Sequence, residues 1–541
     1  MLSATKKRDN KPRSQSTRDT QSSSEPKLIV AGNYLLKLPS VFAIALFLLS
    51  FTNRVQSNEV LVYSFWTSSL VLLVWQGLLL RQCAVKGLQK GFLIALKPQH
   101  YIQAMVHLSV YTYWGMNWQP VQSHALLLVA QLLFAYSFDI LLSWSRRETY
   151  QLGFGPFPII FSTNLFMWFM DDWFYLQFLM VAVGFMGKEF VKWNRDGRLV
   201  HIFNPSAFTL GLFSLVLITT NTTDLTWGPQ IASTLSLAPN MYTYLFMGGL
   251  VVMYFFSITL VAASAAMIMF ALSALYFWYA GVPYFLDSEV PIAVFLGLHL
   301  LVTDPSTSPR TPTGRLVFGL LYGIGVFILY TILDWIGSPT FYDKLLCVPL
   351  LNLSVQWIDR MVSPLRNNKL LEGWGLGVTP SKKANLVHMS VWIAFFVTMS
   401  LLGKTDSRHV GDSLPFWAQA CEEDRPNACK RLILLESTYC NDNSGWACNA
   451  IGENYFYGRY VPQDTERALA YFSRACELRF QAGCLNYLDP SQISSADPRA
   501  FDFRLLLREA GRNLLDMPED ELYARACEHG WEFACDMPTP T

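Results

Sequence analysis

About thirteen apolar segments, each close to the length of a membrane-spanning helix, constrain the fold of this chain more than any other feature. A helix needs roughly twenty apolar residues to cross a hydrocarbon core of about 30 Å, and inside lipid its backbone must satisfy its own hydrogen bonds. A hydrophobic fraction of 52% against 15% charged residues agrees with this interpretation. We therefore expect an all-α chain built around a polytopic bundle of transmembrane helices. The segments lie near residues 35–52, 60–80, 92–118, 124–144, 153–170, 173–191, 203–220, 241–259, 260–281, 288–303, 315–335, 341–360 and 386–403.

Charged residues between the segments predict how the chain is threaded through the bilayer. With the N-terminus inside, all the basic loops fall on one face, which is the pattern of bacterial inner-membrane proteins. This places the N-terminus in the cytoplasm and the C-terminal region in the periplasm. The uncharged pair at 241–281 remains open as two spans or as one re-entrant element, and losing a span there would invert everything downstream. The basic positions are Arg81, Lys86, Lys90, Arg146, Arg147, Lys192, Arg195, Arg198, Arg310, Arg315, Arg360, Arg366 and Lys369.

Residues 1–27 are polar, Ser-rich and basic, and they predict a disordered cytoplasmic tail. At the other end, residues 404–541 carry 14 Lys and Arg against 22 Asp and Glu, so the C-terminal region is acidic. No basic stripe is interleaved with aromatic residues outside the apolar segments, so no nucleic-acid partner is expected.

Paired cysteines set the compartment of the C-terminal region. Eight of the ten cysteines form four pairs, and the members of each pair are eight positions apart. Fixed pairing of this kind favours disulfides in an oxidising compartment, whereas a zinc site, the alternative, usually has shorter CxxC steps. The pairs are Cys421/Cys429, Cys440/Cys448, Cys476/Cys484 and Cys527/Cys535.

The stretch around these cysteines predicts short helices stacked closely on one another. Residues 447–477 suggest two amphipathic helices around a Gly-containing turn, and "RACELRFQAGC" recurs as "RACEHGWEFAC". Over residues 415–538 the chain resembles the Sel-type, tetratricopeptide-related repeats, in particular their cysteine-rich secreted members. The resemblance implies an α-solenoid stapled by disulfides that binds a periplasmic protein. The alternative is a domain that only stabilises or shields the membrane part.

Residues 301–319, "LVTDPSTSPRTPTGRLVFG", combine fixed charge, hydroxyls and proline between two apolar segments. Asp304 and Arg315 are costly near a membrane unless they are paired or line a polar cavity. Prolines stop a helix from running through, which leaves backbone groups for a ligand. The stretch therefore predicts either a polar pocket or a capped loop whose arginine reaches the lipid phosphates. Its hydroxyls belong to Thr303, Ser306, Thr307, Ser308, Thr311 and Thr313, and Gly314 precedes the arginine.

A second polar interruption covers residues 187–208, "GKEFVKWNRDGRLVHIFNPSAF". Asn204, Pro205 and Ser206 are suited to cap and begin a helix at membrane depth. Free amides at the start of such a helix attract anionic groups such as phosphates.

These stretches, together with Asn352 and Asp359 in "LLNLSVQWIDR", resemble the D subunit of the Rnf-type electron transport complex and the B subunit of the sodium-pumping NADH:quinone oxidoreductase. The resemblance covers residues 92–361 and implies a ten-helix core. Residues 28–91 would then add two transmembrane segments, 362–403 a loop and one further helix, and 404–541 the periplasmic domain. Divergent UnbU-type relatives of this family are also similar.

The resemblance implies a flavin, FMN or riboflavin, held near Asn204, Pro205, Ser206, Thr303, Asp304, Thr307, Thr311, Thr313, Gly314 and Arg315. In the family, FMN is esterified to a threonine of a D-G-x-S-x-A-T segment in the loop after the fifth core span. The corresponding loop here, residues 221–240, contains Ser233 and Thr234 without that motif, which argues against covalent attachment and leaves Thr234 as the candidate.

Polar residues inside the segments allow further interpretations. His107, His124, His299 and His388 could ligate haem iron in pairs or hydrogen-bond singly, since no spacing identifies a pair. Asp139 and Glu189 could belong to an ion path, whereas Asp171 and Asp172 are expected in solvent.

No iron–sulfur cysteine cluster and no nucleotide fingerprint is present, so the expected function is an electron-transport subunit that works with other membrane redox subunits. A non-redox membrane scaffold, or a small-molecule or ion transport protein with the same fold, is the alternative.

Overall fold

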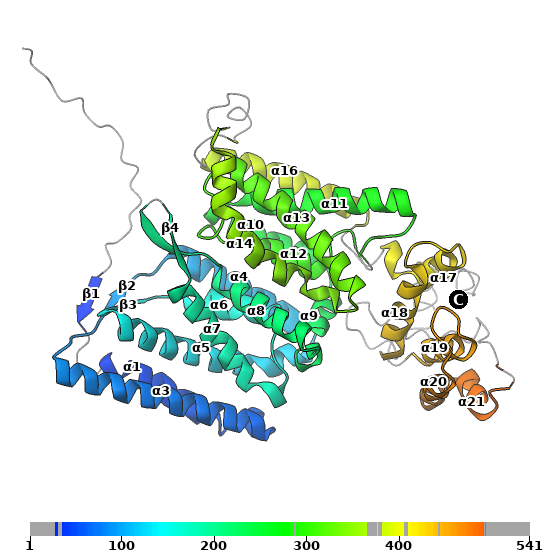
Figure 1. Ribbon diagram of the computed structural model, residues 1–541, viewed down its shortest axis with the longest axis horizontal. Helices are drawn as coiled ribbons and strands as arrows, with labels where there is room; N and C mark the ends of the chain where they lie inside the picture. Colours follow the sequence, from blue (N-terminus) through cyan, green and yellow to red (C-terminus); the bar gives the residue numbers. More distant parts are fainter. Residues whose placement is uncertain are drawn as a thin grey trace, which may run out of the picture.

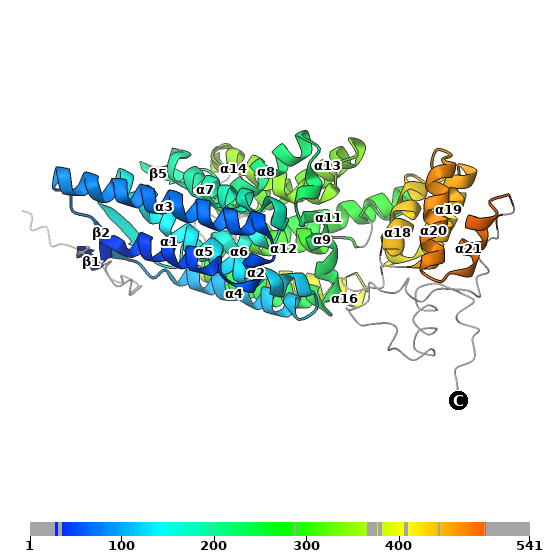
Figure 2. The same ribbon diagram turned by 90° about the horizontal axis from the view of Figure 1, so that it is seen from below.

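The computed structural model describes residues 27–491 and 493, except 31–34, 196, 286–287, 365–375, 377–380, 405–408 and 442–443. The chain is mostly helical, as the sequence predicts. A bundle formed by α1 to α16 makes up most of the molecule, and five shorter helices, α17–α21, lie at one end of it (Figures 1 and 2). We call the latter the C-terminal helices.

The bundle begins with a pair of helices that pack on α5. Its first half comprises α1 (Leu38–Leu49), α2 (Asn53–Gln56), α3 (Glu59–Lys86), α4 (Pro98–Gly115), α5 (Gln119–Arg146), α6 (Pro156–Asn164), α7 (Tyr175–Phe190), α8 (Pro205–Thr219) and α9 (Gly228–Thr234). Its second half comprises α10 (Met241–Phe256), α11 (Thr259–Ala280), α12 (Ile292–Leu300), α13 (Pro312–Trp335), α14 (Asp343–Met361) and α16 (Lys382–Leu401).

Each of the thirteen apolar segments contains a helix, but the helices differ in length. Five are long and apolar enough to cross a membrane, namely α3, α5, α11, α13 and α16. The helices α6 and α12 have nine residues each, or about 14 Å at 1.5 Å per residue, which is too short to cross alone. The segment 241–281 forms two helices, because Ser257 adopts a left-handed conformation (φ 53°) between α10 and α11.

Two sets of five helices pack in the same order. In the first set α4 contacts α6, α5 contacts α6 and α7, and α7 contacts α8. In the second set α10, α11, α12, α13 and α14 repeat those contacts in the same sequence. The sets meet where α8 packs on α14 and α4 packs on α10. The short helices α6 and α12 thus occupy equivalent places, and every residue of α12 is buried.

Short strands occur where the sequence predicts none, so the all-α expectation misses them. The strand β2 (Gly91–Ile94) pairs antiparallel with β1 (Lys27–Val30) and parallel with β3 (Thr149–Leu152). The strands β4 (Lys192–Arg195) and β5 (Arg198–His201) form a hairpin. These segments pair because the backbone leaving a helix still needs hydrogen-bond partners. Lys27, assigned to the disordered tail, begins β1; the rest of that tail lies outside the described residues.

Large apolar side chains point outward along the long helices. On α3, for example, Leu70, Val71 and Leu78 are each 62% exposed. Soluble proteins rarely expose continuous apolar surface of this extent, whereas helices in lipid do so throughout. The surface and the five long helices both indicate a membrane protein.

The C-terminal helices pack in sequence, each on the next, and form an apolar core that includes Val282 of the bundle. Three of the four predicted disulfides are present, and each joins the end of one helix to the start of the next. The fourth pair, Cys527 and Cys535, lies outside the described residues. The helices are α17 (Leu414–Glu422), α18 (Ala428–Asn441), α19 (Gly445–Tyr457), α20 (Thr465–Glu477) and α21 (Gln481–Leu488), and the disulfides are Cys421–Cys429, Cys440–Cys448 and Cys476–Cys484.

Candidate functional site

Asn204 holds the start of α8 against two distant segments of the chain. Its Oδ1 accepts a hydrogen bond from the backbone N–H of Ser206 (3.1 Å), and Pro205 fills the first helical turn, where an N–H would have no partner. Its Nδ2 donates to Leu301 O (3.1 Å), and its backbone N–H donates to Asn352 Oδ1 (3.1 Å). The predicted cap is present, and it also ties α8 to α12 and α14.

Asp304 organises the loop between α12 and α13. Its carboxylate accepts hydrogen bonds from the backbone N–H of Ser306 (2.9 Å), from the Ser306 hydroxyl (2.7 Å) and from the Thr307 hydroxyl (3.1 Å). The Ser308 hydroxyl donates to Asp304 O (2.7 Å). Such contacts within a few residues are typical of a carboxylate that begins a turn, so this part of the loop matches the capped-loop alternative.

Arg315 lies inside the protein and does not extend toward lipid phosphates. Only 9% of the residue is exposed. Its Nε donates to Pro309 O (3.1 Å) and its Nη1 donates to Ser257 O (2.6 Å). The guanidinium therefore fastens the first turn of α13 both to the preceding loop and to the break between α10 and α11.

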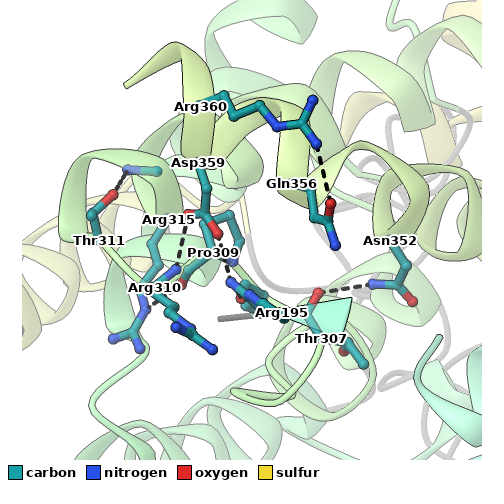
Figure 3. Close-up of polar contacts among 12 residues, drawn as sticks. Arg195, Thr307, Pro309, Arg310, Thr311, Arg315, Asn352, Gln356, Asp359 and Arg360 are labelled. Carbon is teal, nitrogen blue, oxygen red and sulfur yellow. Dashed lines mark hydrogen bonds and ion pairs between the residues drawn. The ribbon is translucent and has the colours of Figure 1, made fainter. Parts of the chain in front are cut away.

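An ion pair between Arg195 and Asp359 closes the same region from the side of the β4–β5 hairpin (Figure 3). Arg195 Nη2 lies 2.7 Å from Asp359 Oδ2 and also donates to Ser308 O (3.1 Å). Asp359 Oδ1 accepts a hydrogen bond from the backbone N–H of Arg310 (3.2 Å). Sequence reasoning treated Arg195 only as a basic loop residue, since nothing local reveals a partner 164 positions away. We call Arg195, Asn204, Asp304, Asn352 and Asp359 the Asn204 cluster.

The remaining predicted hydroxyls beside the Asn204 cluster bond to nearby backbone. Thr311 Oγ1 accepts a hydrogen bond from the Gly314 N–H (3.0 Å) and thereby caps α13. Thr303 Oγ1 donates to a carbonyl in α12 (2.6 Å), and Thr313 Oγ1 donates to Leu376 O (2.6 Å). Asn352 Nδ2 donates to the backbone carbonyl of residue 307 (3.2 Å). The structure thus brings the predicted residues 204–206 and 303–315 together, with their polar groups bonded to one another or to backbone.

The surroundings of the hairpin are cationic. Burial lowers the pKa of His201; the Asp304 carboxylate raises it, and the ammonium groups of Lys188, Lys192 and Lys97 lower it further. Lys192 is also paired with Glu189 and Lys188 with Asp139, so carboxylates balance much of this positive charge.

Thr234 is not part of this region. It lies at the end of α9, and its hydroxyl donates to Gln230 O (2.7 Å). The β4–β5 hairpin precedes α8 and α9 follows it, so the length of α8, about 22 Å for 15 residues, separates Thr234 from the Asn204 cluster. Figure 1 shows α9 and β4 at opposite ends of α8.

The buried histidines occupy separate surroundings. His107 packs edge-on against Phe161, whereas His299 lies among Phe246, Phe295 and Trp392. His299 Nδ1 lies 2.7 Å from the carbonyl of Phe295, as a solitary hydrogen-bonded histidine would. His388 is half-buried on α16.

Sequence reasoning missed a fully buried amide cluster that His124 joins. His124 Nε2 lies 2.9 Å from Asn164 Oδ1, and Gln131 and Asn164 exchange two hydrogen bonds (3.0 and 2.8 Å). Gln177 donates to Gln131 Oε1 (3.0 Å) and accepts from the Phe169 N–H (3.0 Å). The signal that could have revealed it is one amide in each of three adjacent apolar segments.

The acidic residues proposed for an ion path have cationic or hydroxyl partners near the helix ends. Glu189 pairs with Arg146, Arg147 and Lys192, and Asp139 accepts from the Tyr150 hydroxyl (3.1 Å). The two aspartates expected in solvent are partly exposed, and each has a partner: Asp171 pairs with Arg54 (2.8 Å) and Asp172 accepts from Asn58 Nδ2 (2.7 Å).

A phosphorylated ring fits poorly within the Asn204 cluster. Its buried carboxamides and its carboxylates already have hydrogen-bond partners, and a phosphate would have to displace them. The cluster acts as a clamp that joins α8, α13, α14 and the hairpin.

Comparison of this chain with models of known protein families, with characterised proteins and with solved structures found no match. The function proposed below therefore rests on the geometry of the chain itself.

Proposed function

We propose that this protein is a membrane subunit of an electron-transport assembly similar to the Rnf D and NADH:quinone oxidoreductase B subunits. The observation that supports this proposal is the Asn204 cluster. The three stretches that resemble those families lie far apart in the sequence, and residues from all of them meet at Asn204, Asn352 and Asp359. Residues that were selected only because their sequences resemble those families would rarely lie in contact with one another. Their contact therefore supports a similar packing of helices as well as a similar sequence.

The proposal also includes a membrane topology for the whole chain, in addition to the five membrane-length helices. The thirteen segments would cross or enter the inner membrane, with the N-terminus in the cytoplasm and the C-terminal helices in the periplasm as a Sel-type solenoid. Three disulfides in those helices support an oxidising compartment. The short helices α6 and α12 would meet extended segments within the membrane, which is possible only where protein surrounds them.

The flavin, FMN or riboflavin, would be carried outside the Asn204 cluster. Thr234 is the candidate for attachment because it follows the fifth helix of the first set and its side chain is only half-buried. A bound flavin would supply one- and two-electron transfer, and the neighbouring redox subunits would supply donor and acceptor. The chain would contribute the position of the flavin relative to the membrane.

Purified full-length protein tests this function through its flavin content. We expect flavin absorbance in the wild type and its loss in Thr234→Ala, while Ser233→Ala, which changes an adjacent exposed hydroxyl, retains it. Absorbance that survives acid precipitation would indicate an ester, and absorbance released by acid would indicate a non-covalent site. A colourless wild type from flavin-replete cells would refute the electron-transport proposal.

One observation favours a second candidate, a non-redox membrane scaffold whose C-terminal helices bind a periplasmic protein. The Asn204 cluster is paired internally, as expected of a structural clamp. A colourless protein that copurifies with a defined periplasmic partner would support the scaffold. Sodium- or proton-dependent uptake in proteoliposomes would instead support transport.

A further inference from the structure

Two cations of the C-terminal helices face the ends of α11 and α13. Arg425 Nη1 donates to Gly281 O (2.8 Å) directly after α11, and Lys430 Nζ lies 2.8 Å from Asp334 Oδ1 in the last turn of α13. Positive charge is favourable at helix C-termini, where backbone carbonyls lack partners. The turn between α17 and α18, closed by Cys421–Cys429, is thereby seated on the ends of two membrane-length helices.

A cavity of about 50 Å³ lies at this junction. It is large enough for roughly four water molecules. A phosphate or carboxylate group would fit such a space. Its walls combine aromatic rings with both signs of charge and include Tyr276, Tyr284, Tyr330, Trp417, Asp334 and Arg431.

Arg431 is the cation of this cavity that has no carboxylate partner. It is 7% exposed, and its guanidinium carbon lies 5.4 Å from the centre of the Tyr330 ring. The neighbouring cations are paired, Arg425 with Glu423 (2.6 Å) and Lys430 as described, but no ion pair among the described residues includes Arg431. The guanidinium also hydrogen-bonds the Tyr330 side chain, a neutral partner that does not balance its charge.

Charge at the site favours an anion. Burial lowers the pKa of Arg431, but the neighbouring Tyr330 and Asp334 raise it, so the guanidinium stays charged. Lys430 neutralises Asp334 at 2.8 Å, which leaves about one positive charge facing the cavity. Uncompensated buried charge is costly, and a bound oxyanion would relieve that cost.

The cavity also lies at the level expected for lipid headgroups. Trp278 and Tyr279 near the end of α11 and Trp335 at the end of α13 are 81%, 83% and 85% exposed. Aromatic side chains with this exposure at the ends of apolar helices are typical of the membrane–water interface. The two helices that carry them also form the walls of the cavity.

We propose that this cavity binds a phosphate group, with Arg431 as its principal donor and the Tyr276, Tyr284, Tyr330 and Trp417 rings excluding water around it. A planar guanidinium matches two phosphate oxygens at once, and the contact strengthens where water is excluded. The phosphate comes either from an anionic lipid headgroup or from free phosphate. Binding joins the C-terminal helices to the bundle through a ligand as well as through protein contacts.

Full-length protein in nanodiscs tests the proposal. Native mass spectrometry should show one phosphatidylglycerol retained in preference to phosphatidylcholine, and phosphatidylglycerol should raise the unfolding temperature. Arg431→Gln should weaken retention about ten- to hundredfold, because a charged hydrogen-bond donor is lost. Arg431→Lys keeps the positive charge but cannot donate to two phosphate oxygens at once, so its lipid retention should be intermediate. This variant also serves as a check if Arg431→Gln misfolds. Arg467→Gln, at an exposed cation of α20 that does not line the cavity, should retain the lipid.

A second arm separates the two sources of phosphate. If inorganic phosphate added to protein in neutral detergent gives the same Arg431-dependent stabilisation, free phosphate suffices as the ligand. The proposal is wrong if wild-type protein shows neither lipid preference nor phosphate-dependent stabilisation. It is also wrong if folded Arg431→Gln and Arg431→Lys bind as the wild type does.

Discussion

At the scale of single residues, Arg195 and Asp359 show how a contact between distant positions holds the bundle together. The Arg195 side chain is 8% exposed and Asp359 24%, so the pair is shielded from solvent more than a surface ion pair would be. Each residue also bonds backbone of the loop 308–310. Removing either one leaves the other charge and a loop carbonyl or amide without a partner.

We expect Asp359→Asn to destabilise the bundle by about 1–3 kcal/mol, since a partly buried guanidinium loses its carboxylate. Thermal unfolding in one detergent, with Arg195→Gln and the double variant, measures the coupling between the two residues. Arg360→Gln is the matched control, because that exposed side chain donates to Gln356 Oε1 (3.3 Å) at the surface. Equal effects at 359 and 360 would show that the ion pair contributes nothing.

The sequence predicts residues whose partners are local and misses those whose partners are distant. Asn204 was predicted to cap α8 because a cap and its helix are adjacent in sequence. The sequence indicates only a role in orientation for Arg195, since no local pattern points to Asp359. For Arg315 the sequence allows either a pocket or the lipid surface, because its contact with Ser257 depends on how α10 and α11 are placed.

At the scale of secondary-structure elements, Gly281 illustrates a junction where any side chain would displace a neighbour. It ends α11 with φ 68°, and a Cβ at this position would lie 1.9 Å from Arg425 Nη1. Gly337 follows α13 with nearly the same φ of 71°, but a Cβ there would meet no atom within 4 Å. Both glycines therefore adopt a left-handed backbone conformation, but only Gly281 lies against another side chain, that of Arg425.

We expect Gly337→Ala to cost about 1 kcal/mol from backbone strain alone. Gly281→Ala should cost about 1–2 kcal/mol more, because Arg425 must leave the end of α11. Hydrogen exchange should then increase in α17 and α18 for Gly281→Ala only. Identical exchange in the two variants would show that the Arg425 contact does not hold the junction.

A second element-scale prediction concerns Glu436, which is buried where α18 packs on α19. Burial, aided by Glu453, raises the pKa of Glu436 to about 8, although a hydrogen bond from Asn454 lowers it. The folded state therefore holds a proton that the unfolded state releases above about pH 4.5. Stability from this group is greatest at low pH and is lost as pH rises toward 8, by on the order of 4 kcal/mol in total.

Hydrogen exchange of α18 and α19 at pH 5 and pH 8 measures this dependence. We expect protection to fall at pH 8 in the wild type and to vary much less with pH in Glu436→Gln. The exposed residue Glu423 is the control, and Glu423→Gln should leave the dependence unchanged. A wild type equally protected at both values would contradict the assignment of a proton to Glu436.

The helices lie where the hydrophobic pattern predicts them, but several are shorter than the apolar segments that contain them. Every apolar segment contains a helix, yet α6 covers only Pro156–Asn164 of its segment and α12 only Ile292–Leu300. Apolar content alone does not distinguish a half-length buried helix from a full span. The strands β1, β2 and β3 were also missed, since four-residue strands beside long helices carry no clear periodicity.

At the scale of the whole molecule, α13 connects the two ends of the proposed topology. Its first turn bonds the loop that contacts Asp359 of the Asn204 cluster, and its last turn contacts α18. The Asn204 cluster and the C-terminal helices therefore lie at opposite ends of a helix of 24 residues, about 36 Å long. In the proposed topology, which follows the pattern of basic loops, the hairpin end faces the cytoplasm.

Single cysteines on a background without Cys83 and Cys347 test this assignment. In spheroplasts, an impermeant thiol reagent should label a cysteine at the exposed position Leu488 and should not label one at Leu199 in the hairpin. Both should react after the membrane is opened. The reverse pattern would place the C-terminal helices in the cytoplasm and remove the argument for an oxidising compartment.

The docking surface for the C-terminal helices has a consequence for biogenesis. Val282, Gly281 and Asp334, which those helices cover, are synthesised and inserted before residues 414–441 leave the ribosome. The turn that covers them is closed by Cys421–Cys429. An assembling molecule thus exposes an incomplete apolar surface until residues 414–441 have folded onto it and the Cys421–Cys429 disulfide has formed, and a chain that stalls at that stage would present this surface to quality-control proteases.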